Sequence, residues 1–492
     1  MQSSPLNSIS KEALVSKLKQ FIAIESILYE AEDLHPYECD ALSAYRILPL
    51  LVVLPDRIDQ VQAIIKLCRQ FNVPIVTRGA GTGLSGGALP HEQGVLLSLA
   101  KLNQVIEVNA DQRIATVQAG VRNLAISQAV DHLGLYYAPD PSSQIACTIG
   151  GNVAENSGGV HCLKYGLTVH NVQSIKVVTI EGEILNIGSG GLDSSGYDLL
   201  ALMVGSEGML GVIVEVTVKL LAKPAIAKVI LASFDDVVKA GAAVGNIIAA
   251  GIIPAGLEMM DKLAIKAAED FVHAGYPCDV AAILLCELDG DTDEVNSHCQ
   301  KTHELLQSSG AIEIRTAKTE QERQLFWKGR KSAFPAVGRI SPDYYCMDGT
   351  IPRKSLPYVL QTIEDLSKQY NLPVANVFHA GDGNLHPLIL YNANQEGELE
   401  RTEEMGGKIL ELCVEVGGTI TGEHGVGMEK INQMCVQFNS LELQQFHAVK
   451  VAFDPQKLLN PGKAVPELHR CAEFGAMHVH RGKEKFPELE RF

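Results

Sequence analysis

The chain has 492 residues, 46% of them hydrophobic, and a formal net charge of −17 at pH 7. The composition excludes disorder, and the length predicts about two to four domains. An acidic chain is a poor partner for nucleic acids and anionic membranes, because both are bound through clustered basic charge. The eleven cysteines include no CxxC pair, which favours a reducing compartment over a disulfide framework. No apolar stretch approaches the roughly 18 residues that a membrane-spanning helix needs.

From Leu50 onward, short β-branched runs alternate with one amphipathic stretch. A helix is predicted over residues 57–71. Strands are predicted at residues 50–54, 73–77, 94–99, 113–118, 175–180 and 212–219.

The pattern changes near Pro224, and the stretch that follows has little glycine. The following stretch predicts a strand, a long helix, a further helix, a strand, a helix and a strand; the best defined of these lie at residues 227–232, 235–249, 280–288 and 293–308. This order predicts an α+β domain with helices on one face of an antiparallel sheet. A third stretch begins near Asn371, carries the densest polar motifs and finishes on a helical tail.

Residues 78–87 read RGAGTGLSGG and directly follow a predicted strand. Gly81 to Gly86 formally fits the dinucleotide motif G-x-G-x-x-G, but that motif requires a helix to begin there. The continuation into Pro90 disfavours a helix, and with it a Rossmann domain. Two interpretations are left: a nest of backbone N–H groups for a pyrophosphate, or a plain glycine-rich turn between strands.

A second loop region favours the ligand-binding interpretation. Residues 138–143 and 148–159 combine prolines of fixed φ, permissive glycines and short hydroxyl or amide side chains. A stretch of this composition can wrap a flat ring system at close range.

At this point the chain resembles the PCMH-type FAD-binding fold of the vanillyl-alcohol oxidase superfamily, through RGAGTGLSGG (78–87), PDPSS (139–143), TIGGNVAENSGG (148–159) and GSEGMLG (205–211). The resemblance implies that the first loop holds the pyrophosphate, the second lies by the isoalloxazine, and the third helps to seat the nucleotide end. The FAD contacts it implies are Arg78, Gly79, Gly81, Thr82, Gly83, Leu84, Pro139, Ser142, Thr148, Gly151, Asn152, Ser157, Glu207 and Gly208.

Two details of these motifs refine the expectation. Met209 occupies a position where the family usually has Thr, so no side-chain contact is expected there. Some relatives attach the flavin covalently through a His or Cys of the first loop. Residues 78–87 contain neither, which predicts non-covalent FAD.

The stretch FHAGDGNLH (378–386) has an Asp-Gly pair at its centre, a strong signal for a two-residue type I′ hairpin. A turn centred on Asp382 and Gly383 would place His379 directly opposite His386, with Cβ atoms about 5 Å apart. Two imidazoles at that separation can share one divalent ion. The alternative is a pair of hydrogen-bonded histidines at a hairpin end.

A third ligand is available in TGEHGVG (421–427). Neighbouring side chains of an extended segment point to opposite sides, so Glu423 and His424 are not expected to bind the same ion. Glu423 is predicted as the ligand and His424 as a base. Two His and one Glu with an open position suit Zn²⁺ best, and Mn²⁺ or Fe²⁺ would also fit.

A second resemblance supports this division. NVFHAGDGNLHP (376–387) and GEHG (422–425) resemble the FAD-linked oxidase C-terminal domain of D-lactate and D-2-hydroxyglutarate dehydrogenases. There the corresponding His379, His386 and Glu423 hold a divalent metal and His424 takes the substrate proton. Residues 327–353 and 468–480 resemble the FAD-linked catalytic subunits of bacterial glycolate oxidases, and the likeness extends from about Glu38 over nearly the whole chain.

The same resemblance implies that Arg330 holds the substrate carboxylate, for which a planar guanidinium is suited. A salt bridge on a helix surface is the alternative. Residues 344–347 lack the lysine that binds a distal carboxylate in the 2-hydroxyglutarate enzymes, so a small monocarboxylate such as glycolate or D-lactate is expected.

The predicted fold is α+β, with a PCMH-type FAD-binding domain of two α+β subdomains, a ferredoxin-like α+β substrate domain and a C-terminal helical segment. The predicted boundaries are a helical N-terminal segment at 1–45, the FAD-binding domain at 46–222, the substrate and metal domain at 223–465 and a tail at 466–492.

The resemblance implies oxidation of glycolate, and of D-lactate, to glyoxylate and pyruvate. It also implies a complex with a second FAD-binding subunit and an iron-sulfur subunit, which pass electrons to membrane quinone. The chain has no CxxCxxC run for a cluster of its own, so we expect a cytoplasmic subunit held at the inner membrane by its partners. A D-lactate dehydrogenase acting alone and a non-catalytic flavin-binding scaffold are the alternatives.

Overall fold

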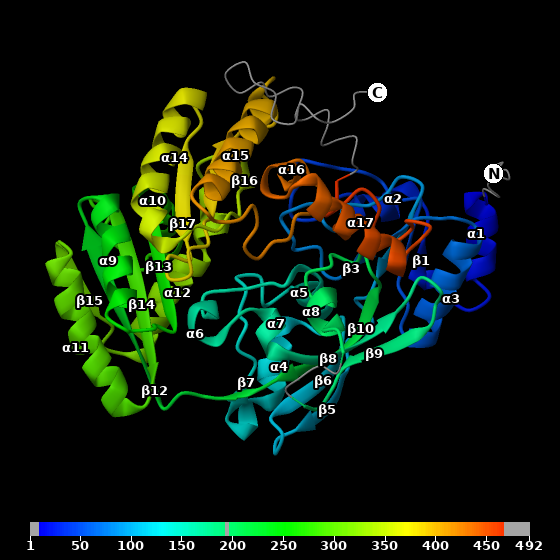
Figure 1. Ribbon diagram of the computed structural model, residues 1–492, viewed down its shortest axis with the longest axis horizontal. Coiled ribbons are helices and arrows are strands. Elements are labelled where there is room, and N and C mark those ends of the chain that lie inside the picture. The colour runs from blue at the N-terminus through cyan, green and yellow to red at the C-terminus, as the bar shows by residue number, and fades with distance from the viewer. Residues whose placement is uncertain (1–8, 192–195, 467–492) are drawn as a thin grey trace.

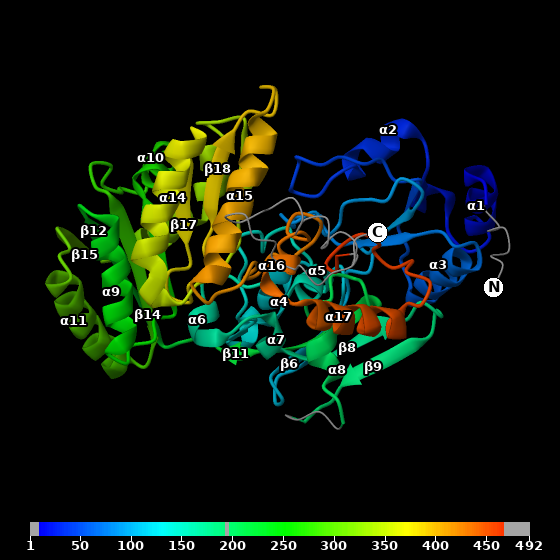
Figure 2. The same cartoon turned by 45° about the horizontal axis from the view of Figure 1, so that its top comes forward.

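The computed structural model describes residues 9–191 and 196–466. Two lobes lie side by side in Figure 1, one built on two sheets of the first half of the chain and the other on a single large sheet. The chain then crosses back, and helix α17 (Ser440–Phe453) lies over the first lobe in both ribbon views (Figures 1 and 2).

The first sheet has four strands in the order β1-β2-β4-β3, of which β2, β4 and β3 are parallel. Its strands are β1 Ile27–Leu28, β2 Leu51–Val53, β3 Ile75–Arg78 and β4 Val95–Ser98. The apolar faces of α1 (Lys11–Leu18) and α3 (Ile58–Gln70) pack into its core. No helix lies between β3 and β4, all of which is described. The absence of a Rossmann helix after the first glycine loop is therefore confirmed.

The second sheet is antiparallel and has the order β5-β6-β10-β8-β9. Its strands are β5 Val105–Asn109, β6 Ile114–Gln118, β8 Val172–Val178, β9 Ile184–Gly188 and β10 Val212–Lys219. The segments around it are α4 Asn123–Val130, β7 Leu135–Tyr136, α5 Ile149–Glu155, α6 Cys162–Tyr165, α7 Thr168–Asn171, α8 Leu199–Met203 and β11 Leu221–Ala222. The sequence predicted a loop where α5 forms. A Cβ at Gly150 would lie 2.7 Å from the Ala119 Cβ, so glycine lets α5 approach its neighbour closely.

The large sheet has seven antiparallel strands in the order β15-β12-β14-β13-β17-β18-β16. Its strands are β12 Ile226–Phe234, β13 Gly256–Asp261, β14 Ala282–Gly290, β15 Glu313–Thr316, β16 Asp343–Cys346, β17 Val374–Phe378 and β18 Pro387–Tyr391. Strand β13 was missed in the sequence, where its six residues fall between two predicted helices.

Helices cover both faces of this sheet, so the prediction of helices on one face is wrong. One face packs against α9 Val237–Ala249, α11 Thr292–Ser308, α14 Leu356–Tyr370 and α15 Glu398–Glu415. The other face packs against α10 Lys262–Val272, α12 Glu320–Lys331 and α13 Ala333–Val337. The physical reason is visible in β14, where eight of nine residues are buried without alternation, the pattern of a strand covered on both sides.

The segment that follows α16 (Met434–Gln437) and α17 forms hydrogen bonds with strand β3 of the first lobe. The Ile75 amide donates to the Leu458 carbonyl at 2.8 Å, and the Asn460 amide donates to the Ile75 carbonyl at 2.7 Å. The predicted tail, including the motif at 468–480, lies outside the described residues. In the part of the chain that the structure describes, no helix is long and apolar enough to cross a lipid bilayer.

Candidate active site

Residues of both lobes line one cavity of about 510 Å³. The first lobe contributes twelve of the fourteen predicted FAD contacts, which are Gly79, Gly81, Thr82, Gly83, Leu84, Ser142, Thr148, Gly151, Asn152, Ser157, Glu207 and Gly208. The second lobe contributes all five predicted catalytic and metal-binding residues, which are Arg330, His379, His386, Glu423 and His424. The structure thus brings together residues as far apart in the sequence as Gly79 and His424.

Arg78 and Pro139 do not line this cavity. The Arg78 guanidinium donates to the Cys39 carbonyl at 2.6 Å and lies over the Tyr37 ring. A Cβ at Gly81 would be 2.1 Å from Arg78 Nη2, so the guanidinium packs directly against the loop. Arg78 therefore supports the first glycine loop, and the Pro139 carbonyl accepts a hydrogen bond from Asn123 Nδ2.

The first-lobe wall fits a ligand with polar edges. A Cβ at Gly83 would meet no atom closer than 3.9 Å, and one at Gly208 none closer than 4.0 Å, so open space lies beside their backbone. Thr148 Oγ1 and Asn152 Nδ2 are buried and, within residues 9–191 and 196–466, have no hydrogen-bond partner. Buried polar atoms are rarely unsatisfied in the functional state of a protein, so a bound cofactor is a natural partner for both.

The second-lobe wall contains three converging ligand atoms. His379 Nε2 lies 3.1 Å and His386 Nε2 2.9 Å from the same oxygen, Glu423 Oε1. The two imidazole rings stand edge to face with centroids 5.0 Å apart. All three side chains are largely withdrawn from solvent. This donor set, two imidazoles and a carboxylate, fits a divalent metal ion.

The hairpin that carries the two histidines has a different register from the predicted one. Val377 donates its amide to the His386 carbonyl, and His379 forms a bridge with Asn384. The turn contains four residues, and only Gly383 has a positive φ, of 85°, whereas type I′ requires two such residues. His379 and His386 are therefore diagonal neighbours on one face, which still brings their rings together.

Glu423 and His424 do not face opposite sides, contrary to the prediction from alternation. The segment is an irregular loop that wraps the buried carboxylate of Asp348, which accepts hydrogen bonds from the amides of residues 422, 423 and 424. Lys430 Nζ lies 3.2 Å from the same carboxylate. Both Glu423 and His424 line the cavity as a result, and the His424 ring stacks on His386 with centroids 4.9 Å apart and planes 8° apart.

Glu258 connects two of the predicted site residues and was missed in the sequence. It lies on β13 with 1% of its surface exposed, accepts from His379 Nδ1 at 2.8 Å, and pairs with Arg330 Nη2 at 2.5 Å. A carboxylate on the far nitrogen of a metal-ligating histidine fixes its orientation. Arg330 itself is fully buried, which rules out the surface salt bridge. The sequence feature that could have pointed to Glu258 is its place as a glutamate within the mostly apolar run GLEMMD, residues 256–261.

The protonation of the site is set by burial and by its carboxylates. Burial alone would lower the pKa of His379, but the carboxylates of Glu258 and Glu423 outweigh it and raise the pKa well above its usual value. The pKa of Glu423 is held well below its usual value, because His379 and His386 outweigh its burial. Burial lowers the pKa of His424 to about 4. His424 is therefore neutral near pH 7 and able to accept a proton.

Two first-lobe residues, Ser85 and Glu207, form hydrogen bonds with the loop that contains His424. Ser85 Oγ donates to the His424 carbonyl at 2.9 Å. Glu207, predicted as an FAD contact, accepts from the amides of Val426 and Gly427 at 2.7 and 2.6 Å. A Cβ at Gly427 would lie 2.1 Å from the Ser85 carbonyl oxygen, so this contact between lobes requires glycine.

A charged network links the PDPSS loop to the helix of Arg330. His161 lies 3.0 Å from Asp140 and 3.2 Å from Glu287 on β14. Lys331 Nζ on α12 pairs with Asp140 at 2.9 Å, and Arg323 on the same helix pairs with Glu287 at 2.7 Å. None of the partners in this network was anticipated from the sequence, because the network joins the PDPSS loop, β14, α12 and His161, which lie far apart along the chain.

Comparison with known proteins agrees with this architecture. The family model of the FAD binding domain matches residues 49–188, and that of the FAD linked oxidases, C-terminal domain, matches residues 223–464. Two solved structures share the fold: 4-ethylphenol oxidase from Gulosibacter chungangensis (TM-score 0.78, 16% identity, 95% of this chain and 100% of that chain) and p-cresol methylhydroxylase (TM-score 0.77, 17% identity, 93% and 97%). The protein is thus an FAD-dependent oxidoreductase of the FAD-linked oxidase class, and the predicted α+β, PCMH-type fold is confirmed.

Relatives of known name narrow the class to enzymes of 2-hydroxy acids. The chain is 66% identical to glycolate oxidase subunit GlcD of Escherichia coli strain K12 over 99% of this chain and 98% of the relative. It is 40% identical to the Bacillus subtilis subunit of the same name (87% and 91% covered) and 31% identical to D-lactate dehydrogenase of Anaerostipes hadrus (94% and 99%). The chain belongs to the glycolate oxidase subunit GlcD family.

Proposed function

We propose that the protein oxidises glycolate to glyoxylate, and D-lactate to pyruvate, with FAD as the electron acceptor. The observation that carries this proposal is the single cavity in which the FAD-binding loops face Arg330 and the His379, His386, Glu423 and His424 cluster. The names of the GlcD and D-lactate dehydrogenase relatives support the substrate class.

Arg330 is the proposed anchor of the substrate carboxylate. Its guanidinium is fully buried, lines the cavity and is oriented on one side by Glu258. Its Nε and Nη1 have no hydrogen-bond partner among the residues described. A buried guanidinium with free N–H groups is suited to bind a planar carboxylate through two hydrogen bonds.

His379, His386 and Glu423 would hold a divalent ion, for which zinc is our first choice and manganese or iron the alternatives. When bound, such an ion would act as a Lewis acid and make the substrate hydroxyl more acidic. Glu258 keeps the His379 ring turned toward the cluster through Nδ1. The backbone amide of Glu423 donates to the Asp348 carboxylate, which holds the Glu423 loop in place.

His424 is the proposed base. Its neutral imidazole accepts the proton of the substrate hydroxyl, and Ser85 and Asp348 fix its backbone while it does so. FAD, when bound, would supply the oxidant that takes the hydrogen of the substrate Cα with its electron pair. Loss of that hydride and of the hydroxyl proton leaves the 2-oxo acid.

The surroundings of Arg330 favour a small substrate. Phe334 and Tyr344 line the same cavity and lie edge to face, with ring centroids 6.2 Å apart. The nearby cation Lys331 is already paired with Asp140. No cation in residues 344–347 is available for a second carboxylate. Glycolate and D-lactate, with one carboxylate each, match this arrangement.

FAD is proposed to bind without a covalent bond, since the first loop contains no His or Cys. Denaturation followed by ultrafiltration should release all of the yellow colour into the filtrate. Colour retained with the polypeptide would contradict this part of the proposal.

We further propose that the protein works as the catalytic subunit of a complex. Its relative of 66% identity is named a subunit of glycolate oxidase, and the chain lacks a CxxCxxC run to bind an iron-sulfur cluster. A second FAD-binding subunit and an iron-sulfur subunit would carry electrons to quinone and bring the protein to the inner face of the membrane. A D-lactate dehydrogenase acting alone is the second candidate, supported by the relative of that name.

The substrate assignment is tested by steady-state reduction of a dye acceptor with glycolate, D-lactate and L-lactate. We expect turnover with glycolate and D-lactate, and the ratio of their kcat/KM values names the preferred substrate. Turnover with none of the three, in protein that carries FAD and metal, would overturn the proposal.

A further inference from the structure

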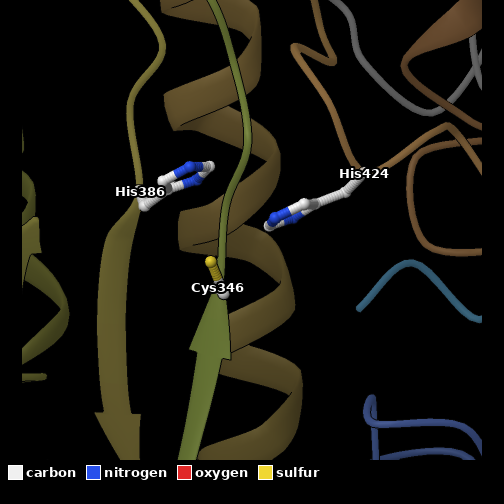
Figure 3. A group of neighbouring side chains, drawn as sticks. All are labelled: Cys346, His386 and His424. Atoms are coloured by element: carbon white, nitrogen blue, oxygen red, sulfur yellow. The ribbon is translucent and has the colours of Figure 1, made fainter. Parts of the chain in front are cut away.

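A second group of potential metal ligands lies beside the first. Cys346 ends strand β16, His386 precedes β18, and His424 belongs to the loop on Asp348. Each offers one ligand atom, and the three atoms lie within 4.8 Å of one another. Figure 3 shows the thiol and the two rings gathered around a common space.

His386 contacts Glu423 through Nε2, and its other ring nitrogen is unpaired among the described residues. His386 Nδ1 and His424 Nδ1 are buried and, throughout the described part of the chain, accept or donate no hydrogen bond. Cys346 is 2% exposed, and its thiol donates to the adjacent Met347 carbonyl at 3.4 Å. Leaving a buried polar nitrogen unpaired costs free energy, which a coordinated cation would recover.

We propose that Cys346, His386 and His424 form an inhibitory site for a thiophilic divalent cation, such as Cd²⁺ or excess Zn²⁺. The set offers one sulfur and two nitrogens, whereas His379, His386 and Glu423 offer two nitrogens and one oxygen. Soft cations prefer thiolate ligands and hard cations prefer oxygen. When the thiol binds the cation, its proton passes to solvent.

Occupation of this site blocks the reaction for two reasons, both of which rest on the proposed function. It engages His424, the proposed base, and it competes for His386, which the two sets share. Cd²⁺ and excess Zn²⁺ are therefore expected to inhibit, while Mn²⁺ and Mg²⁺, which avoid sulfur, are not. Cation binding itself does not depend on the protein's substrate or activity.

The decisive measurement is X-ray absorption at the cadmium edge on the FAD-loaded protein with one equivalent of Mn²⁺ followed by one of Cd²⁺. Wild type should show one sulfur scatterer, and Cys346→Ala none. Cys413→Ala is the matched control, because Cys413 is also buried, near Gly349, but belongs to neither cluster. It should keep the sulfur scatterer. A wild-type spectrum without sulfur would overturn the proposal.

Inhibition is measured separately and normalised to each variant's own rate without cadmium. The Cd²⁺ concentration for half-inhibition should rise at least about tenfold in Cys346→Ala, because a soft ligand is lost, and stay unchanged in Cys413→Ala. Equal inhibition of both variants would contradict the inhibitory role. If Cys346→Ala fails to bind FAD or to fold, Cys346→Ser replaces it, with the same expected loss of the sulfur signal. Protein without activity toward any 2-hydroxy acid refutes the proposed function, and the absorption spectrum still decides on the metal site.

Discussion

The two walls of the cavity are built on different principles. The glycine wall, residues 79–84 and 148–157, presents backbone and short side chains to the cavity. The charged wall, which consists of Arg330, His379, His386, Glu423 and His424, presents buried ionisable groups. In the glycine wall, the residues that line the cavity come from contiguous sequence motifs. In the charged wall, every side chain depends on a partner far away in the sequence, such as Glu258 or Asp348.

This difference decides what substitutions do. A change in the glycine wall acts through backbone strain and an added Cβ. A change in the charged wall leaves an uncompensated charge or an unpaired ligand in a buried site, where the penalty is larger.

The largest effect is expected for His424→Ala. Loss of the proposed base should slow flavin reduction about 100- to 10,000-fold, while FAD stays bound because the glycine wall is untouched. Anaerobic stopped-flow absorbance measures both quantities. The exposed histidine His35 provides the control, and His35→Ala should reduce its flavin at the wild-type rate. A near-normal rate in His424→Ala would remove this residue from the mechanism.

Asp348→Ala should have the next largest effect. The substitution takes one of two carboxylates, the nearer one, from the fully buried Lys430, which keeps only Glu429 at 3.5 Å among the described residues, and it releases three loop amides. We expect a loss of about 3–5 kcal/mol of unfolding free energy, seen as a lower urea midpoint. The double variant Asp348→Ala with Lys430→Met should recover part of that loss, since the buried ammonium that Asp348 balanced is gone. A double variant less stable than Asp348→Ala would contradict this account of the pair.

Glu258→Gln tests the link between the proposed metal ligands and Arg330. A neutral amide holds His379 less firmly and no longer pairs with Arg330, so metal affinity should fall about 10- to 100-fold and KM should rise. Competition with a metal chelator gives the affinity. Glu287→Gln, a buried carboxylate on the adjacent strand β14, should leave metal affinity unchanged. Equal losses in the two variants would indicate a general effect on the sheet.

The smallest effect is expected in the glycine wall. Gly81 and Gly251 have φ values of 70° and 79°, so alanine at either position costs roughly 1–2 kcal/mol of backbone strain. Only at Gly81 would the new Cβ meet other atoms, those of the Arg78 guanidinium. FAD affinity, measured by fluorescence titration of apoprotein, should therefore fall in Gly81→Ala and not in Gly251→Ala. A similar affinity in both variants would show that the contact with Arg78 does not shape the loop.

The sequence predicted the contents of both walls better than their geometry. The glycine motifs are contiguous, so their position after a strand and the absence of a helix after Gly86 could be derived from local rules. The hairpin register was wrong, because tertiary contacts select a four-residue turn where the Asp-Gly pair favours two. The common orientation of Glu423 and His424 could not be predicted either, since it depends on Asp348, some 75 residues earlier.

Other differences have the same origin. Arg78 was expected to contact FAD, because a guanidinium suits an anion. Its guanidinium instead packs against Gly81 and does not line the cavity. Glu258 belongs to no sequence motif. Its place beside His379 follows only from the pairing of β13 with β17. Long-range pairing of buried charges leaves no periodic signal in a single sequence.

The central claim is tested most directly by anaerobic stopped-flow absorbance at the oxidised flavin band, with FAD- and metal-loaded protein mixed with glycolate or with D-lactate. The account predicts rapid bleaching by at least one of these acids, with the ratio of the two rates naming the substrate. No bleaching by either acid, in protein shown to contain both FAD and metal, would contradict it.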